Sequence, residues 1–151
     1  MKTNKIRKVL IAMDFDPSAQ KIAEKGYELA KSMDAQVILL HVPLDLTVYS
    51  LTYLNMGPLQ LDGAEEINDA SVKFLEKVKK HLGDQAIITL VKEGDFAETI
   101  TKAAEELNAD IIVLGSHSRR RLENIIMGSV TEKVLRHTSK PLYIIPTRKW
   151  S

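Results

Sequence analysis

Residues 113–130, VLGSHSRRRLENIIMGSV, join an apolar strand, a loop and the start of a helix. The strand turns at Gly115, where a residue without a Cβ lets the backbone bend and approach a ligand closely. The loop ends at Gly128-Ser129, where the first backbone N–H groups of a helix and its positive dipole end suit an anion. Each small residue alone is typical of a turn or a helix cap. Their occurrence on one strand–loop–helix unit favours a phosphate-binding loop.

The rest of the chain repeats this alternation of strand and helix. Five short apolar runs rich in β-branched residues are predicted strands, at residues 8–14, 35–42, 86–92, 110–116 and 141–146. The runs are continuous rather than alternating, which is typical of strands covered on both faces of a sheet. Helical periodicity lies between them, at residues 17–33, 64–82, 95–108 and from about Val130. The sequence therefore predicts one α/β domain over residues 1–151, with a mostly parallel sheet.

The predicted helices carry signals at their starts and along one side. Asp16 followed by Pro17 predicts an N-cap and a proline at the first helical position. Two other starts have the spacing of a capping box, Asp95 with Glu98 and Ser129 with Glu132. The helix over 64–82 has an apolar stripe formed by Ile67, Ala70, Phe74, Val78 and Leu82.

Composition excludes several broad functions. The 151 residues contain no cysteine, which excludes disulfides and thiol chemistry. Lys plus Arg (21) nearly equals Asp plus Glu (20), a balance that argues against a general binder of nucleic acid or anionic membranes. The N-terminal apolar run VLIAM, residues 9–13, is too short for a signal peptide, and no stretch is long enough to cross a bilayer. We therefore predict a soluble, cytoplasmic protein with no membrane or nucleic-acid partner.

In an open parallel sheet, ligands bind beyond the carboxyl ends of the strands, where the strand order reverses. The predicted strand ends carry Asp14, then His41 with Val42, and then residues 115–117. His41 and His117 have no second paired ligand in the sequence. We therefore interpret them as ordinary strand-end and loop residues, and we predict no metal site formed by the protein alone.

The small residues of the opening stretch have a spacing that resembles the nucleotide-binding signature of the universal stress protein family. That signature is a glycine, two residues, a second glycine, nine residues, and then glycine with serine or threonine. Gly115 and Gly128-Ser129 match its two ends. The resemblance covers essentially the whole chain, in the segments KVLIAMDFDPSAQ (8–20), VILLHV (37–42), EGDFAETI (93–100), NADIIVLGSHS (108–118) and MGSVTEKVLRHTSKPLYIIP (127–146).

The resemblance implies a three-layer α/β/α, Rossmann-like fold of the adenine nucleotide alpha hydrolase type, with parallel strand order 3-2-1-4-5. It also implies homodimers that pair through the last strand, residues 141–146, and leaves a further step to a tetramer open. An exposed apolar edge strand usually needs cover, which agrees with that pairing. The implied function is a stress-response sensor or regulatory module with an unknown signalling partner.

Nucleotide-binding members of the family imply a site for ATP or another adenine nucleotide, with Mg²⁺, if present, held by phosphates, water and Asp14. Asp14 would lie at the ribose or adenine side, and Val42 would meet adenine through its backbone. The base pocket would be lined by Ala12, Met13 and Leu114. The phosphates would be surrounded by Gly115, Ser118, Gly128, Ser129 and Val130. Further nucleotide-contacting residues would be Ser116, His117 and Arg119.

Ser118 departs from the family signature, which has its second glycine at this position. A serine at positive φ has a conformational penalty, although its hydroxyl can donate to a phosphate. Family members without the glycine pattern include proteins that do not bind ATP, so a dimeric protein-interaction module is the alternative prediction. The arginines at 119–121 either reach β- and γ-phosphates or form a solvated helix face.

Two further features concern activity and assembly. The chain lacks the Walker A pattern and shows no nucleophile–base pair, so we predict at most weak ATP hydrolysis. Residues 43–63, PLDLTVYSLTYLNMGPLQLDG, form a long connection that is too apolar for a disordered linker. Three positions for this segment remain open: over the site, against a partner subunit, or against its own domain.

Overall fold

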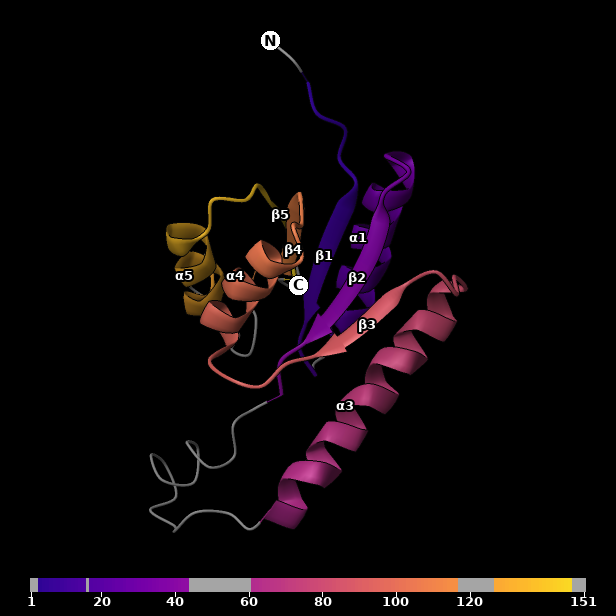
Figure 1. Cartoon of the computed structure of the whole chain (residues 1–151), viewed down its shortest axis with the longest axis vertical. Coiled ribbons are helices and arrows are strands. Elements are labelled where there is room, and N and C mark those ends of the chain that lie inside the picture. Colours follow the sequence, from indigo (N-terminus) through magenta and orange to yellow (C-terminus); the bar gives the residue numbers. More distant parts are fainter. Residues whose placement is uncertain (1–2, 16, 44–60, 117–126, 148–151) are drawn as a thin grey trace, which may run out of the picture.

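Helices and strands alternate along the computed structural model, which describes residues 3–15, 17–43, 61–116 and 127–147 (Figure 1). The strands are β1 (Lys8–Met13), β2 (Gln36–His41), β3 (Ile88–Val91), β4 (Ile111–Gly115) and β5 (Leu142–Ile145). The helices are α1 (Ala19–Ser32), α3 (Leu61–Leu82), α4 (Phe96–Glu106) and α5 (Ser129–His137). All the predicted strands and helices are confirmed.

The strands form one parallel sheet in the order β3-β2-β1-β4-β5. β1 lies at its centre and pairs with β2 from Lys8↔Gln36 to Met13↔His41. Its pairing with β4 is shorter, from Val9↔Ile111 to Ile11↔Val113. The predicted strand order is confirmed, and the carboxyl ends of the strands meet at one edge of the sheet.

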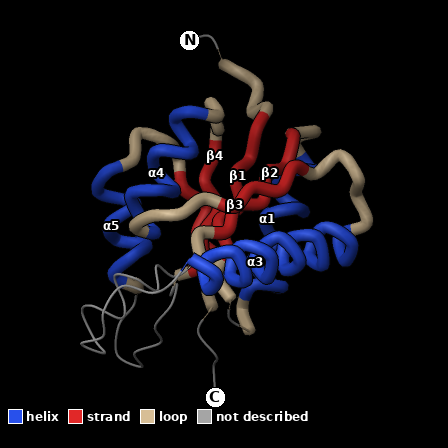
Figure 2. The backbone as a smooth tube through the Cα atoms, turned by 60° about the horizontal axis from the view of Figure 1, so that its bottom comes forward, coloured by secondary structure: helices blue, strands red, loops and turns tan. Residues whose placement is uncertain are grey.

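Helices cover both faces of this sheet, so the fold has the expected three layers (Figure 2). α1 and α3 pack on the face that carries Val9 and Ile11, whereas α4 and α5 pack on the face that carries Leu10 and Ala12. Val9, Leu10 and Ile11 are all fully buried. Because successive side chains of a strand point to opposite faces, two covered faces require a continuous apolar run.

The strands at the two edges of the sheet are less covered than the sequence predicts. Ile88 of β3 is 44% exposed and Tyr143 of β5 is 39% exposed. The expectation of cover on both faces is correct for β1, β2 and β4 and wrong for these edge positions. An edge strand has a neighbour on one side only, so part of its side chains stays exposed even where a helix packs beside it, as α3 does beside β3 (Figure 1).

The start of α1 differs from its prediction. The helix begins at Ala19 after the N-cap Ser18, so Pro17 lies in the preceding turn rather than at the first helical position. Ser18 has helical dihedral angles (φ −83°, ψ −11°), and no described side chain caps this helix. Asp16, the predicted cap, lies outside the described residues.

The buried side of α3 is also partly different from the prediction. The helix begins at Leu61, before the predicted residue 64. Ala70 is exposed, whereas Ser71 and Leu75 are fully buried and Val78 is 9% exposed. These three residues are spaced by four and three positions, so they form one helix face. Ser71, rather than the predicted Ala70, therefore lies on the buried face of α3.

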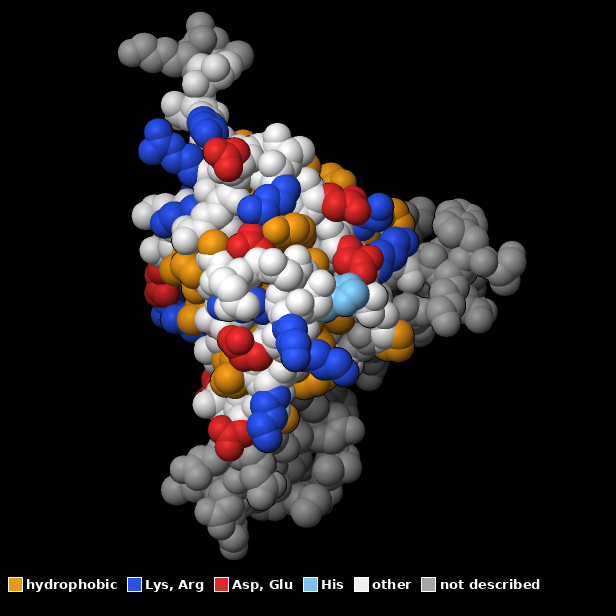
Figure 3. All heavy atoms as spheres, turned by 90° about the vertical axis from the view of Figure 1, so that its right-hand side faces the viewer, with side chains coloured by type: hydrophobic (Ala, Val, Ile, Leu, Met, Phe, Trp, Pro, Cys, Tyr) orange, Lys and Arg blue, Asp and Glu red, His pale blue; other side chains and the backbone are white. Residues whose placement is uncertain are grey.

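Charged side chains of both signs are interspersed on the right-hand side of the molecule as seen in Figure 1, which Figure 3 shows face on. This mixture agrees with the near-neutral net charge of the chain. Among the described residues, no helix is long and apolar enough to cross a membrane.

A polar network joins α1 to the turn that follows α3. The Lys31 ammonium lies 3.0 Å from the Asp84 carboxylate, and the Tyr27 hydroxyl donates to the same carboxylate at 2.9 Å. The backbone N–H of Ala86 donates to its other oxygen at 2.9 Å. The hydrogen bond from Lys31, then those from Ala86 and Tyr27, lower the pKa of Asp84 to about 2.

Asp84 should therefore contribute to the acid sensitivity of the fold. Its pKa is lower in the folded chain, so its stabilising contribution is complete above the ordinary carboxyl pKa of about 4 and disappears as the pH falls to about 2. We expect Asp84→Asn to reduce the pH dependence of the free energy of unfolding in this window, measured by urea unfolding at each pH. Asp34→Asn, at a side chain 94% exposed, is the matched control. An unchanged slope in Asp84→Asn would contradict this assignment.

Candidate functional site

The candidate site lies at the carboxyl edge of the sheet, between β1 and β4. β1 pairs with β2 up to Met13, whereas its pairing with β4 ends at Ile11, although β4 continues to Gly115. The chain leaves β1 towards α1 on one face, and it leaves β4 towards α5 on the other. The direction in which successive strands are added to the sheet thus reverses between β1 and β4. Ligands of open α/β sheets usually bind at this reversal point, beyond the carboxyl ends of the two strands.

The predicted base-pocket residues do not all share one face of the sheet. Ala12, Val42 and Leu114 are buried together in the core below α4 and α5. Met13 is buried in the opposite core, below α1 and α3. Three of the predicted residues therefore share one core, whereas the side chain of Met13 lies on the other face of the sheet.

His41 holds the end of β1 from the neighbouring strand. Its ring is 1% exposed, and its Nδ1 lies 2.9 Å from the backbone oxygen of Met13. Because a carbonyl oxygen only accepts, Nδ1 carries the proton of this bond. The ring also lies edge-on to Phe15, at 4.9 Å between centroids, and Phe15 contacts Phe74 at 4.3 Å. In this position His41 connects the ends of β1 and β2 through its Nδ1.

Asp14 follows directly after β1 and is half-buried. The backbone N–H of Phe15 donates to its Oδ1 at 3.1 Å, so the carboxylate lies close to the backbone at the strand end. A carboxylate accepts hydrogen bonds from hydroxyl groups, which is the chemistry that a ribose offers.

Gly115 has a packing role that differs from the expected one. A Cβ at this position would lie 2.6 Å from Cδ1 of Ile22 and 2.9 Å from Cγ2 of Thr147, closer than side chains normally approach. Its φ is not in the left-handed region. The close approach of α1 and of the chain after β5 thus explains a glycine at this position, and the predicted contact of Gly115 with a ligand stays a prediction.

Ser116 connects three segments of the chain. Its N–H donates to the Ile145 oxygen at 2.9 Å, and its Oγ accepts from the N–H of Thr147 at 3.0 Å. Its backbone oxygen accepts from the N–H of Gly128 at 2.7 Å. The hydroxyl of this predicted ligand-contacting residue is thus directed to the end of β5, while the backbone of the same residue holds the start of α5.

The predicted capping box of Ser129 and Glu132 at the start of α5 is wrong. Gly128 is the N-cap, with extended dihedral angles (φ −66°, ψ 155°), and Ser129 is the first helical residue. Among the described residues no side chain caps this helix. Ser129 is exposed and Val130 is half-buried. A helix start with a glycine cap leaves its N–H groups and positive dipole end accessible to an anion.

Two threonines that the sequence did not single out support this helix start. Thr131, in the first turn of α5, is fully buried and its Oγ1 donates to the Gly115 oxygen at 2.8 Å. Thr147 is 4% exposed and contacts Ser116 through its N–H and, at 3.3 Å, through its Oγ1. Both contacts join residues far apart in sequence, so neither leaves a local pattern that could be recognised.

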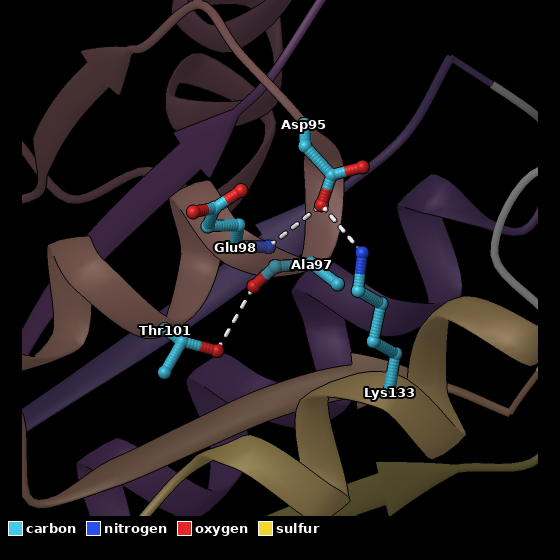
Figure 4. A network of polar contacts seen from close by, with 5 residues as sticks. All are labelled: Asp95, Ala97, Glu98, Thr101 and Lys133. Carbon is cyan, nitrogen blue, oxygen red and sulfur yellow. Dashed lines mark hydrogen bonds and ion pairs between the residues drawn. The ribbon is translucent and has the colours of Figure 1, made fainter.

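α4 is fixed against α5 by the N-cap that the sequence predicts (Figure 4). The Asp95 carboxylate accepts from the N–H of Glu98 at 3.0 Å and lies 3.2 Å from the Lys133 ammonium of α5. The predicted capping function of Asp95 is confirmed. A hollow of about 570 Å³ lies between the two helices, lined by Ala97, Glu98, Thr101, Lys102, Glu105, Glu106, Lys133 and His137.

Part of the predicted site lies outside the described residues. This part contains His117, Ser118 and Arg119, the other two arginines of the run, and residues 44–60 of the long connection. Their predicted roles stay predictions. Among the described residues, no group of three or more histidine, aspartate or glutamate side chains is placed to hold a metal ion.

An open parallel sheet with strand order 3-2-1-4-5 and a reversal point between β1 and β4 defines a Rossmann-like α/β protein. Within that class, the family model for the universal stress protein family matches residues 5–146. The chain belongs to the universal stress protein family. The family suggested by the glycine spacing is therefore confirmed.

Individual relatives agree with this membership. The chain is 31% identical to universal stress protein MJ0577 of Methanocaldococcus jannaschii, covering 92% of this chain and 94% of that protein. The solved structure of MJ0577 superposes with a TM-score of 0.79 at 28% identity, over 98% of this chain and 100% of that one.

Two more distant structures share the fold and contain adenine nucleotides. A universal stress protein in complex with cAMP has a TM-score of 0.64 at 19% identity, covering 96% of this chain and 100% of that chain. The universal stress protein from Archaeoglobus fulgidus in complex with dAMP has a TM-score of 0.59 at 17% identity, covering 94% and 99%. At these identities the likeness establishes the fold alone.

The buried Thr131 hydroxyl gives a prediction about the start of α5. We expect Thr131→Val to lower the free energy of unfolding by about 1–3 kcal/mol, because the Gly115 oxygen loses its buried donor. Thr101→Val is the matched control, since the Thr101 hydroxyl donates at 2.9 Å to Ala97 within its own helix (Figure 4). The Ala97 oxygen keeps its helical backbone donor in that variant. Equal losses in the two variants, measured by urea unfolding, would contradict a special role for Thr131.

Proposed function

We propose that this protein binds an adenine nucleotide at the carboxyl edge of the sheet, with the phosphates at the start of α5. The observation that carries the proposal is the glycine-capped helix start at Gly128, next to the point where β1 and β4 stop pairing. A phosphate suits this position because free N–H groups and the helix dipole act together there. The family relatives that contain cAMP and dAMP support the choice of an adenine nucleotide.

The base and the ribose would lie towards β1 and β2. Ala12, Val42 and Leu114 are adjacent at the base side, and Asp14 supplies a carboxylate for ribose hydroxyls. Met13 is buried in the opposite core, so its contribution is limited to the backbone. On the phosphate side, the backbone N–H groups of Ser129 and Val130 would face the phosphates, while the N–H of Gly128 donates to the Ser116 oxygen. Ser118 and Arg119 remain predicted contacts. Mg²⁺ would arrive with the phosphates.

The proposed biological function is that of a cytoplasmic, dimeric stress-response sensor. Nucleotide occupancy would stabilise one arrangement of the loop between Gly115 and Ser129 and so change the surface offered to a signalling partner. ATP, ADP, AMP and cyclic AMP are all candidates. Weak ATP hydrolysis is compatible with this role, but the sequence lacks the Walker A lysine that would bind a γ-phosphate.

A dimeric interaction module that does not bind ATP is the second candidate function. It is favoured by Ser118, which replaces the second glycine of the family signature. The two functions differ in one measurable property, the affinity of the purified chain for nucleotides.

Calorimetric titration with the four nucleotides tests the proposed binding and its location. We expect wild-type protein to bind at least one of them below millimolar concentration, and Gly128→Val to weaken that affinity by more than about tenfold, a loss above about 1.4 kcal/mol. The branched side chain would occupy the place of the phosphates. Gly128→Ala, with a smaller side chain, should give an intermediate loss.

Two results would contradict the proposal in different ways. Absence of binding by the wild-type protein at millimolar nucleotide would favour the interaction module. Unchanged affinity in Gly128→Val, with the dimer intact, would place the nucleotide elsewhere on the chain.

We further propose that two copies pair through β5. This strand forms an edge of the sheet, and its Tyr143 is 39% exposed, so among the described residues it is an apolar edge that a second copy could cover. A twofold pair would bring the same residues of both copies together.

Charge placed on this edge should separate the copies. We expect Tyr143→Lys to convert dimer to monomer in sedimentation velocity experiments, because like charges then oppose each other across the twofold axis. Ile88→Lys is the matched control, since Ile88 is 44% exposed on the opposite edge strand β3. Dissociation by Ile88→Lys, or a dimer that survives Tyr143→Lys, would contradict pairing through β5.

A further inference from the structure

The end of β5 is connected to the proposed phosphate site through Ser116. The N–H of Ser116 donates to the Ile145 oxygen at 2.9 Å, and its Oγ accepts from the N–H of Thr147 at 3.0 Å. Its backbone oxygen receives the N–H of Gly128, the N-cap of α5, at 2.7 Å. Ser116 thus bridges the edge strand and the helix start at which we place the phosphates.

From these contacts we infer that Ser116 is a positioning residue of the phosphate site, acting through the Gly128 N–H. The inference rests on the proposed nucleotide binding and adds a residue that holds the helix start in place. The Ser116 hydroxyl accepts from the backbone N–H of Thr147, so its effect on a ligand is transmitted by the backbone of Ser116. This role differs from the direct ligand contact that the sequence suggests.

The segments that contact Ser116 are packed closely enough to hold it in place. Thr147 is 4% exposed, and its Cγ2 faces Gly115, where no Cβ can be accommodated without displacement. The Lys21 ammonium of α1 donates to the Pro146 oxygen at 2.8 Å, which fixes the same segment from the other side. The end of β5 is therefore held between α1 and β4, and Ser116 is held by it.

Removal of the Ser116 hydroxyl should loosen the helix start but leave the base side unchanged. Ser116→Ala removes the hydrogen bond between the Thr147 N–H and the Ser116 Oγ. We expect the Gly128 amide of this variant to exchange with solvent about fivefold faster than in the wild type, which corresponds to the net contribution of one hydrogen bond. The dissociation constant for AMP should rise by a similar factor, about fivefold, while that for adenosine, which has no phosphate, stays within about twofold.

Two variants serve as controls. Ser139→Ala removes a hydroxyl that donates to Glu105 at 2.8 Å, beyond the opposite end of α5, and should leave both dissociation constants unchanged. Thr147→Val removes the 3.3 Å contact of Oγ1 but keeps the N–H that donates to Ser116, so AMP affinity should stay within about twofold of the wild type.

The outcomes separate this inference from the proposed function. If wild-type protein binds AMP and Ser116→Ala weakens AMP and adenosine equally, or weakens neither, the positioning role is overturned and nucleotide binding stands. If wild-type protein binds no nucleotide, both are overturned. A loss confined to AMP, together with faster exchange at Gly128, supports the inference.

Discussion

The central position of β1 is the constraint on which the structure depends. This strand pairs in parallel with β2 on one side and with β4 on the other, and helices cover both of its faces. Such a strand must be apolar throughout, and its carboxyl end must lie beside those of both neighbours. The connections that follow β1 and β4 leave towards opposite faces, so the edge between them is the place where a ligand can approach the backbone of both strands.

The small residues at this edge have separate physical roles. Gly115 is required because Ile22 and Thr147 occupy the space of a Cβ. Gly128 supplies a helix N-cap without a side chain, at the point where the N–H groups of α5 begin. The two glycines of the signature therefore have different structural roles, packing at Gly115 and helix capping at Gly128, and their spacing alone does not show which residue has which role.

The sequence predicted the architecture well because its signals are local and repeated. Continuous apolar runs marked all five strands, and Asp95 with Glu98 marked the start of α4 correctly. The strand order came from the family resemblance, since spacing alone does not fix it. The cap of α5 was placed one residue late, because glycine and serine are both acceptable N-caps and only the fold selects between them. Thr131 and Thr147 were missed because their partners, Gly115 and Ser116, are distant in sequence.

The proposed nucleotide site, where β1, β4 and α5 meet, can be located directly by backbone amide shifts of isotope-labelled protein titrated in turn with ATP, ADP, AMP and cyclic AMP. We expect a nucleotide that binds to cause the largest shifts at residues 128–131, with a second group at Asp14 and Val42. Shifts concentrated on the hollow between α4 and α5, or the absence of shifts with all four nucleotides at millimolar concentration, would contradict this position of the site.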